Sequence, residues 1–144
     1  MTSPILSTLV FNKLPGNWIL QRAVSGFGKM NGRAVFTTLK QNLLKYREEG
    51  VQESGVTFFR EYFYQHQDQA IVIYFDEQFS RPFQNLTFKD LQVQSEHLCG
   101  CDVYKGIYDF REIAFGKFTI TYEVEGPNKK YVTYTQYTKE PEEL

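Results

Sequence analysis

The sequence contains few cysteines and no excess of charge of either sign. Cys99 and Cys101 are its only cysteines, so it cannot carry the set of disulfide bonds that stabilises many small secreted domains. Its 16 Lys and Arg residues are balanced by 17 Asp and Glu residues. Such a balance gives no electrostatic basis for binding nucleic acid or an anionic membrane surface, and we expect neither among its partners.

Long hydrophobic runs are also absent. The first residues, MTSPILSTLVFNKL, have no basic segment and only a short, broken apolar run, so they do not resemble a secretory signal. No stretch is long and apolar enough to form a membrane-spanning helix. We therefore expect a cytoplasmic protein with no membrane span. At 144 residues, one domain with a hydrophobic core is expected.

Aromatic residues are what the sequence has in excess. Thirteen Phe, ten Tyr and one Trp make up 17% of the chain. Bulky rings favour strands over helices because they fit a pleated, half-buried surface. Buried tyrosine hydroxyls need hydrogen-bond partners, so we expect an interior that is polar as well as apolar.

The residue pattern predicts one short helix at the start of the chain. Residues 3–13 form this helix, with Ser3 as its N-cap and Pro4 at the first helical position. Pro15-Gly16 ends it. Its apolar face is expected to consist of Ile5, Leu6, Leu9 and Val10.

Strands are expected over the rest of the chain. Nine segments have strand character, and residues 91–98 are the candidate for a tenth; the nine are 17–24, 33–39, 43–50, 56–66, 70–75, 81–88, 103–110, 117–124 and 131–137. Turns are expected at 26–32 and at 126–128. Spacings of about ten residues with short turns predict an all-β fold, an up-and-down antiparallel β-barrel of about 8–10 strands over residues 16–139. Residues 140–144 are expected to be an acidic tail.

Gly16-Asn17-Trp18 lies between the expected helix and the first strand. This Gly-x-Trp resembles the first signature of the calycin superfamily, which includes lipocalins and fatty-acid-binding proteins. The resemblance implies that Trp18 lies at the closed end of the barrel and that a basic residue of the last strand, here Lys139, packs across it. It also implies a cation–aromatic cluster of Arg22, Trp18 and Lys139.

A longer set of motifs resembles an uncharacterised bacterial family, a domain of unknown function with a lipocalin-like fold. The sequence departs from the family pattern at Gln84 and Lys139. The resemblance implies the barrel but no activity. Its motifs are Leu14-Pro-Gly-x-Trp18, Tyr46-Arg-Glu-Glu-Gly50, Arg60-x-Tyr62, Arg81-Pro-Phe83, His97-Leu-Cys-Gly-x-Asp102-x-Tyr104, Gly126-Pro-x-Lys-x-Tyr131 and Tyr137-x-Lys139.

Strand alternation predicts which side chains share the inner face of the barrel. If Trp18 points inward, so does Arg22. A buried Arg or Glu needs a partner, so Arg22, Glu48 and Arg60 should satisfy one another in part. A remaining donor could bind a ligand carboxylate or carbonyl, although a purely structural network is the alternative. The predicted ligand-binding residues are Arg22, Tyr46, Glu48, Arg60, Tyr62, His97, Tyr104 and Tyr131.

The segment EHLCGCDVYKGIYDF (96–110) raises other interpretations. In a regular strand His97, Cys99 and Cys101 share one face, which suggests zinc. Residues two apart on a strand are about 7 Å apart, too far for one tetrahedral ion unless Gly100 forms a bulge. A Cys99–Cys101 disulfide would be strained, and a Cys-His nucleophile lacks an identifiable oxyanion donor. We expect no metal here, and interpret the cysteines as two small, partly buried side chains.

The sequence thus predicts a barrel that binds a small hydrophobic or amphipathic molecule with an acidic or carbonyl group. It identifies no cofactor. One alternative is a lyase or isomerase acting in the barrel pocket. Another is a homodimeric interaction module, suggested by the rings on both faces of 56–66. The candidates for catalysis are His97, Cys99, Cys101, Glu48 and Tyr104.

Overall fold

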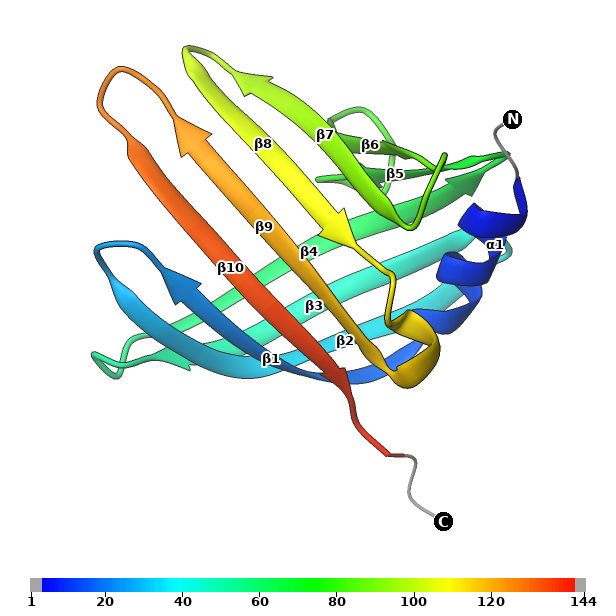
Figure 1. The fold of residues 1–144 in the computed structure, drawn as a ribbon, viewed down its shortest axis with the longest axis horizontal. Coiled ribbons are helices and arrows are strands. Elements are labelled where there is room, and N and C mark those ends of the chain that lie inside the picture. Colours follow the sequence, from blue (N-terminus) through cyan, green and yellow to red (C-terminus); the bar gives the residue numbers. More distant parts are fainter. Residues whose placement is uncertain (1–3, 142–144) are drawn as a thin grey trace.

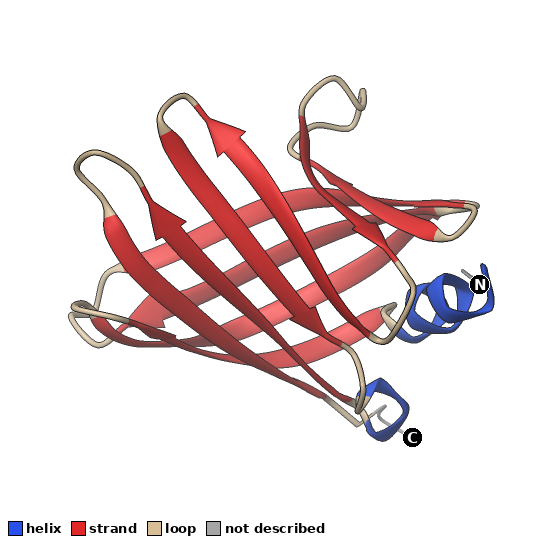
Figure 2. Cartoon of the chain, turned by 45° about the horizontal axis from the view of Figure 1, so that its top comes forward, coloured by secondary structure: helices blue, strands red, loops and turns tan. Residues whose placement is uncertain are grey.

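Ten antiparallel strands curl round a common core in the computed structural model, which describes residues 4–141 (Figures 1 and 2). The predicted all-β barrel with a short N-terminal helix is confirmed, and the candidate tenth strand is present as β7. The helices are α1 (Pro4–Lys13) and the 3-10 turn η1 (Ile113–Phe115). The strands are β1 (Gly16–Val24), β2 (Gly28–Lys40), β3 (Leu43–Gln52), β4 (Thr57–Gln67), β5 (Ala70–Tyr74), β6 (Pro82–Thr87), β7 (Gln92–Cys99), β8 (Asp102–Asp109), β9 (Lys117–Glu125) and β10 (Lys130–Lys139).

The order of the strands follows the chain, and β1 also pairs with β10. This arrangement leaves one seam, between β6 and β7, where the sheet order ends on both sides. Side chains span the seam: the backbone N–H of Asn85 donates to Ser95 Oγ at 3.2 Å, and Gln84 Nε2 donates to the Tyr104 carbonyl at 3.5 Å. The barrel is therefore nearly closed.

The predicted turn at 26–32 is wrong at its C-terminal end, because β2 already begins at Gly28. Gly32 lies opposite Gly50 in the β2–β3 pair. A Cβ atom on Gly32 would lie 2.1 Å from the Glu49 carbonyl oxygen, so glycine is needed there for the close approach of two strands. Two of the three glycines in residues 26–32, Gly28 and Gly32, therefore belong to strand β2. The predicted turn at 126–128, between β9 and β10, is confirmed.

Helix α1 covers one end of the barrel (Figure 1). Ser7 Oγ lies 2.9 Å from His66 Nε2 and donates to the Asp68 carbonyl at 2.8 Å, and the Phe11 ring stacks on His66. The predicted apolar face is wrong in part, because Ile5 and Leu9 are 72% and 40% exposed. The helix is turned so that its packed face includes the polar contacts of Ser7. The predicted N-cap, Ser3, lies outside the described residues. The buried residues of the helix and its end are Ser7, Val10, Phe11 and Leu14.

Trp18 lies buried at this closed end, as the calycin resemblance implies. Its Nε1 donates to the Leu14 carbonyl at 2.9 Å, and Lys139 Nζ lies 4.7 Å from the centre of the Trp18 ring. The expectation that Arg22 joins this cluster is wrong, because its guanidinium pairs with Glu48 instead. Among residues 4–141, no helix is both long and apolar enough to cross a membrane.

Candidate functional site

A buried ion pair lies in the middle of the barrel. Arg22 on β1 and Glu48 on β3 point inward, and two guanidinium nitrogens donate to the two carboxylate oxygens at 2.7 and 2.9 Å. Arg22 Nε donates to Thr135 Oγ1 on β10 at 2.7 Å. This bidentate geometry is the strong form of the Arg–carboxylate interaction. The positive charge of Arg22 is therefore neutralised by a protein group.

Two tyrosines complete this network. Tyr46 donates to Glu48 Oε1 at 2.6 Å, and its hydroxyl oxygen lies 2.8 Å from that of Tyr137. Burial by itself raises the pKa of the Glu48 carboxyl, but the hydrogen bonds from Arg22 and Tyr46 outweigh it, so its pKa lies below the usual range. Burial raises the pKa of Tyr137 to about 12. At neutral pH the network thus holds one carboxylate and neutral phenols.

Beneath the open end of the barrel, this network surrounds a void of about 20 Å³. A space of that size holds about one water molecule, so no ligand fits there. Above it lies a larger cavity of about 240 Å³. Arg60, Tyr62 and Tyr122 border both spaces and so separate them.

The larger cavity is lined by side chains from seven strands or their ends. Seven of its eleven lining residues carry a ring, and Val124 is the only aliphatic side chain among them. The wall is therefore aromatic, with polar edges. The lining residues are Arg60, Tyr62, Phe75, Phe83, His97, Cys99, Tyr104, Tyr122, Val124, Tyr131 and Thr133.

Phe83 forms the centre of the aromatic wall. A bulge in the β5–β6 pairing lets both Phe83 and its neighbour Gln84 point into the barrel. The Phe83 ring stacks on Tyr62 with centroids 5.4 Å apart and planes 14° apart. Its ring centre lies 5.4 Å from that of His97, in an edge-on contact, and 4.8 Å from that of Phe75, in a tilted contact. These mutual contacts hold the rings in place around the cavity.

Arg60 brings a second cation to the cavity. It is exposed at the cavity's mouth, and its guanidinium interacts with the Tyr62 hydroxyl. Within residues 4–141, no carboxylate lies within ion-pair distance of Arg60. Glu48 attracts the Arg60 guanidinium electrostatically but makes no direct contact with it, because the Glu48 carboxylate oxygens accept hydrogen bonds from Arg22 and Tyr46. Arg60 thus offers donors to whatever enters the cavity.

The structure brings the eight predicted ligand-binding residues into two adjoining groups. Arg22, Tyr46 and Glu48 line the small void, and the others line the larger cavity. The predicted ligand-binding set does not include Phe75, Phe83, Tyr122, Val124 and Thr133. Strand alternation from the inward-facing Tyr131 and Ile120 identifies Thr133, Tyr122 and Val124, whereas the bulge that turns Phe83 inward leaves no such signal.

The segment 96–110 is not one continuous strand, which is the arrangement that would put His97, Cys99 and Cys101 on one face. Gly100 and Cys101 form a two-residue turn between β7 and β8, with φ of 62° at Gly100. Cys99 and Cys101 are free thiols, and both are exposed rather than partly buried. His97 lies opposite Tyr104 in the β7–β8 pair, and both line the cavity. In the described part of the chain, no three His, Cys, Asp or Glu side chains gather as a metal site would require.

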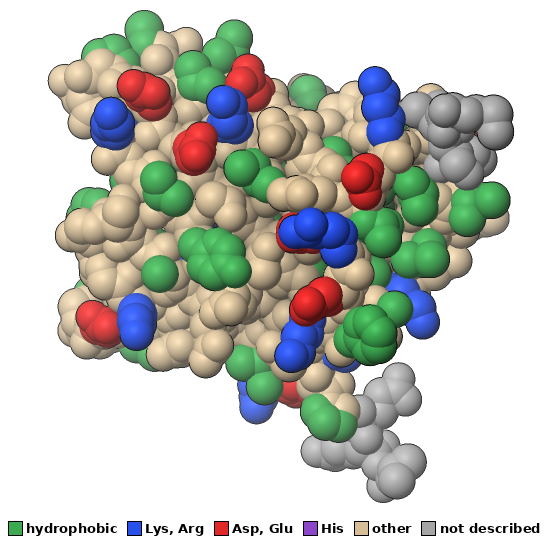
Figure 3. Space-filling view, viewed as in Figure 1, with side chains coloured by type: hydrophobic (Ala, Val, Ile, Leu, Met, Phe, Trp, Pro, Cys, Tyr) green, Lys and Arg blue, Asp and Glu red, His purple; other side chains and the backbone are tan. Residues whose placement is uncertain are grey.

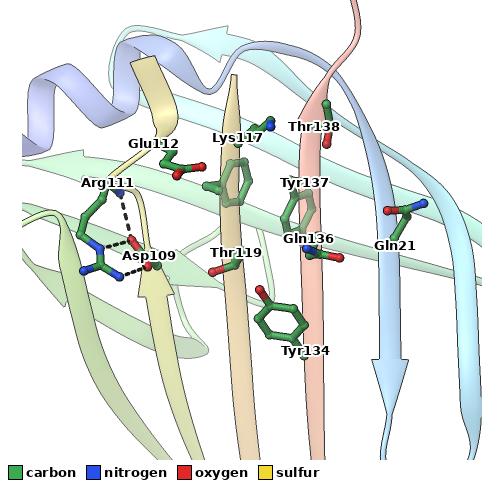
Figure 4. A pocket seen from close by; sticks show the side chains of 11 residues that line it. Gln21, Asp109, Arg111, Glu112, Lys117, Thr119, Tyr134, Gln136, Tyr137 and Thr138 are labelled. Carbon is green, nitrogen blue, oxygen red and sulfur yellow. Dashed lines mark hydrogen bonds and ion pairs between the residues drawn. The ribbon is translucent and has the colours of Figure 1, made fainter. Parts of the chain in front are cut away.

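A wider depression of about 580 Å³ lies outside the barrel, over β8, β9, β10 and β1 (Figure 4). Gln21, Tyr134 and Gln136 lie on it, and Asp109 and Arg111 pair with each other at its edge. The visible face carries acidic and basic groups side by side (Figure 3). None of the predicted site residues lies there. We therefore take the aromatic cavity, with its unpaired guanidinium, as the candidate site.

The outer face of β4 carries an aromatic side chain, as the interaction-module alternative requires. Phe59 is 65% exposed, and the Arg47 guanidinium lies 4.7 Å from its ring centre. One such ring does not define an interface. The homodimer, the lyase or isomerase activity and the cytoplasmic location all stay predictions.

The fold and site define a nearly closed antiparallel β-barrel with an aromatic cavity near one end. The chain belongs to a family of unknown function, DUF6314, whose family model matches residues 14–139. The resemblance to a family without assigned activity is thereby confirmed. Comparison with curated proteins gives no match.

Solved structures share this fold at low identity. The chain is similar to the S-type phycobiliprotein lyase CPES from Guillardia theta, with a TM-score of 0.71 and 7% identity over 99% of each chain. It is similar to Rv2717c from M. tuberculosis, with a TM-score of 0.55 and 9% identity over 94% of this chain and 98% of that one. It also resembles the barrel EF1p2_mFAP2b bound to DFHBI, with a TM-score of 0.55 and 10% identity over 90% and 96%. These likenesses show the fold alone.

Proposed function

We propose that this protein binds a small, partly apolar molecule in the aromatic cavity, which is lined by strands β4 to β10, without catalysing a reaction. The observation that carries the proposal is the cavity of about 240 Å³ with aromatic walls and one guanidinium that lacks a carboxylate partner. Apolar walls with a few placed polar groups are the usual composition of small-molecule sites. An acidic or carbonyl group of the ligand accepts hydrogen bonds from Arg60.

The two arginines differ in a way that supports a binding role. A buried charge needs a partner in the protein, whereas a cation exposed at the mouth of a cavity stays hydrated and available to a ligand. Arg22 is matched in this way by Glu48, whereas Arg60 is not. A similar barrel gives independent support, since it was solved with the small molecule DFHBI bound.

Native mass spectrometry tests the proposal with a matched pair of variants. Cys99 lines the cavity, whereas Cys101 lies on the adjoining turn and is not among the lining residues. Cys99→Trp should narrow the cavity, while Cys101→Trp should leave it open. Protein stripped of small molecules and incubated with a metabolite extract should retain a small molecule as wild type and as Cys101→Trp. Retention by Cys99→Trp should fall at least about tenfold.

Two results would remove the proposal. The first is that wild-type protein retains no small molecule from any extract. The second is that Cys99→Trp retains it as well as Cys101→Trp does, because the ligand would then bind elsewhere on the molecule. Far-ultraviolet circular dichroism of both variants checks that each keeps the β-barrel.

A further inference from the structure

We infer that the ligand is a planar aromatic or conjugated monocarboxylate of one or two rings, rather than a long-chain lipid. This inference rests on the proposed binding function and narrows it to one class of molecule. It depends on three features of the cavity: its net charge, the residue types of its wall and the depth of its floor.

The charges around the cavity match one negative charge on the ligand. Arg22 and Arg60 carry two positive charges, and Glu48 carries one negative charge that Arg22 binds directly. One positive charge therefore remains for the ligand, on Arg60. A guanidinium presents paired N–H groups in a plane, which matches the two oxygens of a carboxylate. A dianion such as a phosphate monoester would leave one charge unmatched at this site.

The wall of the cavity favours flat, unsaturated ligands. Phe83 and Tyr62 are stacked, and His97 and Tyr104 meet Phe83 edge-on, so a ligand meets ring faces and ring edges. Flat rings gain stacking and edge-to-face contacts with such a wall. Val124 is the only aliphatic lining residue, so a flexible acyl chain would find little aliphatic surface to replace water.

The depth of the cavity limits the length of the ligand. Tyr62 and Tyr122 close its floor, and below them lies only the void of about 20 Å³. Tyr122 is an uncharged part of this floor, because burial raises the pKa of its phenol well above its usual value. Its hydroxyl is hydrogen-bonded to that of Tyr108, which holds it in place. A cavity of about 240 Å³ is smaller than the roughly 300 Å³ at the lower end of pockets for drug-sized ligands. One or two rings fill it, and the rest of a long chain would have to leave through the mouth into water.

Three matched probes test the inference by isothermal titration calorimetry. 2-Naphthoate is planar and anionic, 2-naphthamide is its neutral analogue, and undecanoate carries the same carboxylate and carbon number on a flexible chain. Wild-type protein should bind 2-naphthoate at least about tenfold more tightly than either of the others.

Variants at two arginines identify the anchor. Arg60→Gln should weaken 2-naphthoate binding about 10- to 100-fold, because a charged hydrogen bond is lost, and change 2-naphthamide binding by less than about threefold. Arg47→Gln is the control, since Arg47 lies on the outer face of β3 and pairs with Glu49 and Glu61. It should leave both affinities unchanged.

The outcomes distinguish failure of the proposed ligand class from failure of the binding function. Undecanoate or 2-naphthamide binding as tightly as 2-naphthoate, or Arg60→Gln binding 2-naphthoate as wild type does, would overturn the inference while leaving the binding function intact. If none of the three probes binds, the inference is also lost. Retention of another small molecule in native mass spectrometry then keeps the binding function, and its absence removes both.

Discussion

Replacing Glu48 by alanine is expected to lower the free energy of unfolding by about 3–5 kcal/mol, as measured by urea denaturation at neutral pH. The substitution removes the two carboxylate oxygens that accept from the Arg22 guanidinium, which is buried and cannot shed its proton, and leaves it only the Thr135 hydroxyl. It also leaves the buried Tyr46 hydroxyl without the carboxylate to which it donates. The cost is large because a buried charge loses its partner, not because the pair itself contributes that much.

Two controls separate this cause from a general loss of charge. Glu49→Ala removes the neighbouring carboxylate, which pairs with Arg47 at the surface, and should cost less than about 1 kcal/mol. Arg22→Met combined with Glu48→Leu should recover most of the stability lost in Glu48→Ala, because no unpaired charge remains. If Glu48→Ala costs no more than Glu49→Ala, the buried ion pair does not exist as described.

The same pair gives wild type an acid-sensitive component of stability. Because the folded-state pKa of Glu48 lies below its unfolded value, its stabilising contribution is complete above the unfolded pKa, near 4.3. It is lost as the pH falls through the lower, folded value. Wild type should therefore lose more stability between pH 5 and pH 2 than the Arg22→Met, Glu48→Leu double variant.

Trp18→Ala is expected to cost about 3–5 kcal/mol of unfolding free energy. Trp18 is fully buried at the closed end, where Phe118 packs edge-on at 4.8 Å and Lys139 covers the ring. Truncation leaves a cavity beside α1 and removes the donor to the Leu14 carbonyl. Thermal unfolding followed by circular dichroism measures the loss.

Ile19→Ala is the matched control for this prediction. Ile19 follows Trp18 on β1 but points outward and is partly exposed, so its truncation should cost within about 1 kcal/mol. A Trp18→Ala variant as stable as Ile19→Ala would contradict the closed-end packing. Ligand binding at the opposite side of the barrel should survive in Trp18→Ala at temperatures where it stays folded.

Much of the fold is predictable from the sequence because period-two alternation and turn spacing are local signals. Trp18, Leu20 and Arg22 are buried on one face of β1, as that alternation predicts. The Gly-rich stretch 26–32 is ambiguous in the sequence, because glycine serves both turns and close strand contacts. Only the pairing of Gly32 with Gly50, 18 residues apart in sequence, distinguishes the two.

The site is only partly predictable, because its geometry depends on contacts between distant strands. Alternation places Arg22, Glu48 and Arg60 toward one interior, but it cannot tell which arginine Glu48 will bind. In the structure Glu48 pairs with Arg22, and Arg60 lies at the mouth of the cavity without a carboxylate partner. The bulge at Phe83 and the turn at Gly100 both break the period on which the sequence argument depends.

A two-dimensional NMR titration of isotope-labelled protein with 2-naphthoate tests most directly whether the barrel takes its ligand into the aromatic cavity. Saturable shifts confined to the backbone amides of Arg60, His97, Tyr104 and other cavity residues are predicted. Shifts centred on Tyr134 and Gln136, in the depression on the outer face, would contradict binding inside the barrel.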